Sequence, residues 1–65
     1  MYRDSLAVIA SAFVREASQC WETACVLDEL GDVRSADELS HRATRLAVAA
    51  GYLRGRAARP ERSQD

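Results

Sequence analysis

The sequence contains no lysine, only one proline and one histidine, and only two cysteines. One proline and three glycines provide too few turns for a fold made of many short strands. Aromatic residues make up 6% of the 65 residues, beside 48% apolar and 29% charged residues. These proportions are typical of a globular domain and argue against disorder or low-complexity sequence. The chain is also too short for a dinucleotide-binding domain or an α/β barrel.

The two cysteines, Cys20 and Cys25, cannot cross-link one continuous helix. Their Cα atoms would lie about 8 to 9 Å apart and about 140° around the helix, whereas a disulfide needs about 4.4 to 6.8 Å. We therefore expect two free, buried, structural thiols and a reducing, cytoplasmic location. A chain of this size buries little surface by itself, so association is expected to supply the missing stability.

The apolar run over residues 6–14 does not predict a membrane segment. It is far shorter than the roughly 20 residues that span a bilayer. It also continues directly into Arg15 and Glu16, which does not fit a secretory signal. We therefore expect no contact with a membrane.

Charge is distributed unevenly along the chain. Residues 1–38 carry three arginines and eight acidic residues, a net charge of −5, whereas residues 39–65 carry six arginines and two acidic residues, a net charge of +4. Such a separation favours antiparallel pairing of two copies, or leaves a basic segment for an acidic partner. The use of arginine in place of lysine, together with many alanines, indicates a GC-rich, bacterial genome.

Two long amphipathic patterns predict an all-α fold, an antiparallel two-helix hairpin with a short C-terminal extension. Asp4 and Ser5 are good N-caps for a helix over 5–30, and Gly31-Asp32 forms the turn. The second helix is expected over 33–50, capped by Asp32 or by a capping box that starts at Ser35. Gly51 either ends this helix or lies within it. Residues 52–58 are therefore an extension that either continues the second helix or forms a short separate turn. We assign residues 1–59 to one domain and 60–65 to a polar tail.

The apolar faces of the two predicted helices differ in width. The first spans about 160° and the second about 120°, and the second is rich in alanine. One partner helix cannot cover the wider face, so we predict that two hairpins dimerise into a four-helix bundle. The first arc and its edges supply the expected interface residues, which are Leu6, Ile9, Phe13, Val14, Trp21, Cys25 and Leu27. The second face consists of Ala36, Leu39, Ala43, Leu46, Ala47, Ala50 and Leu53.

The segment Gly31–Leu46, GDVRSADELSHRATRL, resembles the second half of a tetratricopeptide repeat. Its turn and its small and aliphatic positions match at Gly31, Asp32, Ala36, Ala43 and Leu46, and Ala24 and Leu27 fit the preceding helix. Trp21 lies one residue from the aromatic position of the family, Ser40 replaces a large aromatic residue, and no proline closes the unit. The resemblance is partial and occurs once, and it implies protein or peptide binding.

Other motifs supply weaker alternatives. Glu38 and His41 have the Glu-x-x-His spacing of ferritin-like di-iron bundles, which would make the chain a metal-binding half-ferritin-like hairpin. Both residues fall outside the apolar stripe, and no zinc signature or nucleophile motif is present. We therefore predict no enzyme activity, no cofactor and no catalytic or metal-binding residue.

The C-terminal arginines, Arg54, Arg56, Arg59 and Arg62, suggest a second function, that of a nucleic-acid-associated regulator. The favoured function is a small non-enzymatic protein–protein interaction module, either an adaptor, a regulator or an accessory subunit. Its expected partner is a second copy, a larger protein, or both.

Overall fold

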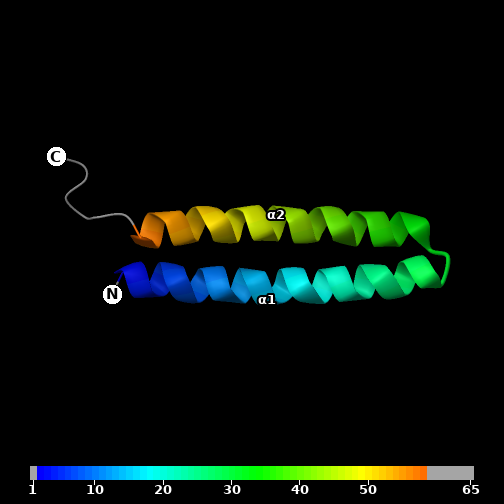
Figure 1. The fold of residues 1–65 in the computed structure, drawn as a ribbon, viewed down its shortest axis with the longest axis horizontal. Helices are drawn as coiled ribbons and strands as arrows, with labels where there is room; N and C mark the ends of the chain where they lie inside the picture. Colours follow the sequence, from blue (N-terminus) through cyan, green and yellow to red (C-terminus); the bar gives the residue numbers. More distant parts are fainter. Residues whose placement is uncertain (1, 59–65) are drawn as a thin grey trace.

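The computed structural model describes residues 2–58 as two long helices and, within that range, no strand. Helix α1 spans Tyr2–Glu29 and helix α2 spans Val33–Ala58. The helices lie side by side and antiparallel along their whole lengths, with the connecting turn at one end (Figure 1). The predicted all-α helical hairpin is therefore confirmed.

The turn is built from backbone hydrogen bonds that terminate α1. The Asp32 N–H donates to the Leu27 carbonyl over 2.9 Å, and the Gly31 N–H donates to the Asp28 carbonyl over 3.0 Å. This is a Schellman motif, which requires a left-handed residue at its centre. Gly31 provides it with a φ of 93°, a conformation that costs glycine little.

Helix α2 is capped by Asp32, whose carboxylate Oδ1 accepts a hydrogen bond from the Ser35 N–H over 3.2 Å. The alternative capping box at Ser35 and Glu38 is not formed, because Ser35 already lies inside the helix. An aspartate directly after the turn satisfies the first free N–H groups, so no later cap is needed.

Both helices contain more residues than the sequence predicted. Helix α1 begins at Tyr2, so that Asp4 lies in the first turn, where its charge favours the helix dipole. Helix α2 continues through Gly51 to Ala58. A glycine costs a helix interior about 1 kcal/mol, and the half-buried Leu53 and Ala57 beyond it offset this cost by packing toward α1.

The core is a narrow seam with a heptad repeat. Along α1 the seam residues are Leu6, Ala10, Phe13, Ala17, Cys20, Ala24 and Leu27, and along α2 they are Ala36, Leu39, Ala43, Leu46, Ala50, Leu53 and Ala57, all of them buried or half-buried. Their alternating spacing of three and four residues is that of a coiled coil. Ala17, Cys20 and Ala43 form the central cluster, against which Leu39 and Leu46 pack.

The turn allows a direct test by a matched pair of glycine substitutions. Gly31→Ala is expected to lower the free energy of unfolding by about 1 to 2 kcal/mol, because an alanine at positive φ is strained. Gly55→Ala should raise it by about 1 kcal/mol, because Gly55 is helical and a β-carbon there meets open space. Urea denaturation at one fixed protein concentration measures both, and equal effects of the two variants would contradict the assigned turn.

Candidate functional site

The residues beside the seam form two unlike sides of the hairpin. Successive helical residues are rotated by about 100°, so residues seven apart share a side. On one side Asp28 lies near Val33 and Trp21 lies near Ser40, around a common groove. The same register, continued by one heptad, brings Val14 opposite Ala47.

We call this side the uncharged face, because its central part contains no charged residue among those that the structure describes. Its members come from both helices at heptad spacing. They are Ser11, Val14, Ser18, Trp21 and Cys25 of α1 and Ser40, Thr44, Ala47 and Gly51 of α2. Charged residues border it only toward its two ends, with Asp28 and Asp37 at the turn end and Asp4 and Arg54 at the open end.

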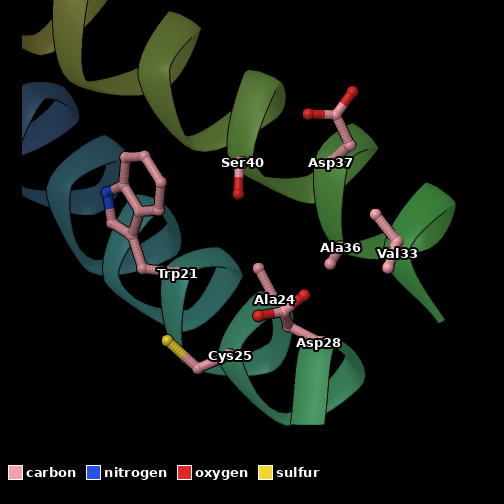
Figure 2. A pocket seen from close by; sticks show the side chains of 8 residues that line it. All are labelled: Trp21, Ala24, Cys25, Asp28, Val33, Ala36, Asp37 and Ser40. Carbon is pink, nitrogen blue, oxygen red and sulfur yellow. The ribbon is translucent and has the colours of Figure 1, made fainter. Parts of the chain in front are cut away.

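A shallow groove of about 360 Å³ opens on this face beside the turn (Figure 2). The methyl groups of Ala24 and Ala36 lie between the helices, and the indole of Trp21 stands at one end of the groove. Asp28 and Asp37 also line the groove; in Figure 2 the Asp28 carboxyl group lies beside Ala24, whereas the Asp37 carboxyl group points away from α1. The groove therefore combines an aromatic ring with two acidic groups.

The opposite side, which we call the charged face, carries Glu16, Glu38, Arg42 and Arg45. Arg42 Nη2 donates to Glu16 Oε2 over 3.0 Å, which joins α1 to α2. Both side chains remain about half exposed, so this ion pair adds at most about 1 kcal/mol of stability. Because it carries exposed charges of both signs, the charged face is better suited to contact with water than the uncharged face is.

The structure divides the residues that the sequence assigned to an interface. Val14, Trp21 and Cys25 lie together on the uncharged face, and Trp21 is 44% exposed. Leu6 is buried and both Phe13 and Leu27 are half-buried in the seam, where they pack the hairpin itself. Ile9 is exposed on the other flank of α1, toward the charged face.

Cys20 is buried and Cys25 is exposed, and neither forms a disulfide. Both thiols are free, as expected, and Cys25, which was predicted at the dimer interface, is exposed in the single hairpin. The reason is their separation of five residues, which turns the second thiol away from the seam that holds the first.

Sequence reasoning missed Ser40, Thr44 and Gly51 as members of the surface, and assigned Ala47 to the core face of α2. Ala47 is exposed because it lies one residue beyond the seam position Leu46. A signal that could have found these residues is an absence of charge: over about three turns of α2, one flank carries only small, uncharged side chains.

The two C-terminal arginines within the described range, Arg54 and Arg56, do not share one side of α2. Arg54 and Arg56 are two residues apart, about 200° around α2, so they lie on opposite sides of the helix. The guanidinium of Arg56 lies over the ring of Tyr52, 5.9 Å from its centroid. Arg59 and Arg62 lie outside the described residues.

Glu38 and His41, the residues with the di-iron spacing, are both exposed on the outer surface of α2. Within residues 2–58, no three or more histidine, cysteine or acidic side chains are grouped so as to hold a metal ion. Neither of the two helices described in that range has the length and apolar character needed to cross a membrane.

The residues that resemble a tetratricopeptide repeat lie mainly in the seam and the turn. Ala24, Ala36 and Ala43 are buried, and Gly31 and Asp32 form the turn described above. Comparisons with protein-family models, with curated proteins and with solved structures found no match to this chain.

Proposed function

We propose that this chain is a small non-enzymatic protein–protein interaction module that acts through its uncharged face, as an adaptor, a regulator or an accessory subunit. Its partner is a second copy of the same hairpin, and the two form a four-helix bundle. The single observation that supports this most strongly is the mismatch between a core of small side chains and large apolar side chains that stay exposed.

The buried residues of the hairpin are mostly alanines. Leu6 and Cys20 are the exceptions, beside Ala10, Ala17, Ala24, Ala36, Ala43 and Ala50, and no large side chain is fully buried among the described residues. Because hydrophobic stabilisation follows the apolar area removed from water, at about 25 cal/mol per Å², such a seam stabilises the fold weakly. Covering Trp21, Val14 and Cys25 would add the missing burial.

The choice of the uncharged face follows from the cost of burying charge. Apolar side chains such as Val8, Val26 and Val48 are also exposed, but they alternate with charged neighbours on the outer surfaces of the helices. Burying an unpaired charge costs several kcal/mol. The cores of protein interfaces are accordingly depleted of charged residues and enriched in aromatic residues. The uncharged face has this composition, with Trp21 as its aromatic residue.

The resemblance to a tetratricopeptide repeat points to the same class of function. Hairpins of that kind are stable when a neighbouring hairpin covers their open side. A single hairpin that lacks further repeats can satisfy the same need by pairing with its own copy, which gives a closed, symmetric assembly.

The test is the mass of the native chain in dilute solution. We expect light scattering behind size exclusion to give twice the 7.2 kDa of one chain at micromolar concentration, with melting temperatures that rise with protein concentration. A cooperatively melting particle of 7.2 kDa, independent of concentration, would contradict self-association and would leave the face without its proposed partner.

A further inference from the structure

We infer that the two copies pack antiparallel through their uncharged faces, so that Trp21 of each copy lies level with Gly51 of the other and Asp37 lies level with Arg54. This inference rests on the proposed function and goes beyond it, because it specifies the orientation and the contacts of the partner. It follows from the helix register, the sizes of the side chains and the distribution of charge.

The register fixes which residues come level when the hairpins overlap fully. The midpoint of α1 lies between residues 15 and 16, and that of α2 lies between residues 45 and 46. At a rise of about 1.5 Å per residue, Trp21 lies about 8 Å from the midpoint toward the turn, and Gly51 lies about 8 Å toward the open end. Asp37 and Arg54 lie about 13 Å from the midpoint, again in opposite directions. A two-fold axis across the midpoint therefore brings both pairs level.

Side-chain size supports this register. Trp21 is the largest side chain on the uncharged face. Its indole fills the face at that level along the helix axis, so a second large side chain does not fit there. At the same distance on the other side of the midpoint the face carries Gly51 and Ser11, with Ala47 close by. Gly51 is exposed, and a β-carbon there would meet nothing within 4 Å. The small side chains at this level are therefore what leaves space for a large side chain of a partner. Knobs set into such holes are the packing mode of helical bundles.

Charge supports the same orientation. The turn end, over residues 22–38, holds six acidic residues and one arginine, Arg34. The open end carries one arginine, Arg54, and one acidic residue, Asp4, beside the uncharged face, so it is much less acidic than the turn end. Antiparallel packing brings Arg54 of one copy to the groove of the other, where Asp37, Asp28 and the Trp21 ring suit a guanidinium.

A parallel arrangement of the two copies would lack both the charge pairing and the steric match. It would place both acidic turn ends side by side, where like charges repel. It would also bring the two Trp21 rings to one level and leave both Gly51 levels without a large side chain. The antiparallel arrangement avoids both conflicts.

The orientation is tested by the distance between two spin labels. A variant carrying Glu29→Cys, with Cys20→Ala and Cys25→Ser, has one labelling site on the outer surface of α1 at the turn end. We expect a separation of about 40 Å between labels in the antiparallel dimer, from the helical rise. A distance of about 30 Å or less, which is the width of the bundle when both turn ends lie at the same end, would overturn the inference while leaving self-association intact. Light scattering on the same labelled sample establishes that it is a dimer.

The contacts are tested by charge reversal with a matched control. Asp37→Arg and Arg54→Asp should each weaken dimerisation about tenfold, and the double variant should restore most of the loss. Glu38→Arg makes the same charge change at the neighbouring residue, which faces the charged side, and should have less than half that effect on a logarithmic scale. Equal weakening by Asp37→Arg and Glu38→Arg, or no rescue in the double variant, would overturn the proposed pairing.

Steric complementarity has its own control within α2. Gly51→Phe should weaken the dimer, since it fills the space proposed for Trp21 of the other copy. Gly55→Phe makes the same change on the outer surface of the helix and should leave the dimer unchanged. Equal dissociation constants for these two variants would contradict the proposed packing of Trp21.

Discussion

Replacement of Trp21 by aspartate is expected to convert the proposed dimer into monomers, with a rise of at least about 100-fold in the dissociation constant. A tryptophan at the centre of an interface commonly contributes 2 kcal/mol or more, and 100-fold corresponds to about 2.7 kcal/mol. The new carboxylate adds a desolvation cost, because dimerisation would remove it from water. Analytical ultracentrifugation over a range of concentrations measures the change.

The matched control is Val26→Asp, which introduces the same charge on the same helix. Val26 is 53% exposed, comparable to the 44% exposure of Trp21, but lies away from the uncharged face. We expect this variant to stay dimeric. If both variants dissociate alike, the interface lies elsewhere or includes all of α1, and the uncharged face loses its assignment.

Trp21→Asp also separates association from folding. The Trp21 side chain lies beside the seam, so the hairpin retains its heptad contacts after the substitution. We expect circular dichroism to show helix in the variant at high protein concentration, with a lower melting temperature than the parent. Such loss of stability follows from the loss of the partner, since binding to the native state alone raises stability by mass action.

The hairpin could be predicted from sequence because its signals are local. Gly31 and Asp32 combine a left-handed C-terminal residue with an N-cap, and no other glycine or proline interrupts residues 2–50. The heptad of alanines on each helix also marks the seam, with Ala10, Ala17 and Ala24 on α1. These features depend on neighbours within one or two turns, which a sequence displays directly.

The flank on which a partner docks could not be predicted in the same way. The apolar arc of α1 is wide enough that α2 could cover either of its edges, and the turn decides which. The structure leaves Val14 and Trp21 on one edge and Ile9 on the other. Only the three-dimensional register shows that the first edge adjoins the small residues of α2 and the second adjoins the Glu16–Arg42 ion pair.

The C-terminal end of α2 could not be predicted either, because it also depends on contacts between the helices. Gly51 lowers helix propensity, but propensity is a weak preference beside tertiary packing. Leu53 and Ala57 continue the seam beyond it, so the burial that extends α2 comes from α1, far away in the sequence. The same extension encloses Leu6, which a helix ending at residue 50 would leave exposed.

The second substitution with a large expected effect on stability lies at the centre of the seam. Ala43→Leu should lower the free energy of unfolding by about 3 kcal/mol, at the upper end of the usual cost of overpacking. Ala43 is 0% exposed and packs with Ala17 and Cys20 in the central cluster. Three added carbon atoms have no space there unless the helices separate, and separation would expose the neighbouring seam layers. Urea denaturation followed by circular dichroism measures the loss.

Ala58→Leu is the control, because it makes the same change in the same helix at an exposed residue. We expect its free energy of unfolding to stay within about 0.5 kcal/mol of the parent. The comparison also tests how the two interfaces depend on each other. Because the uncharged face is built from flanks of both helices, helices forced apart by Ala43→Leu should also dimerise more weakly. A variant that keeps full stability and full dimerisation would show that the seam is loosely packed, and would remove the rigid surface on which the proposed interface depends.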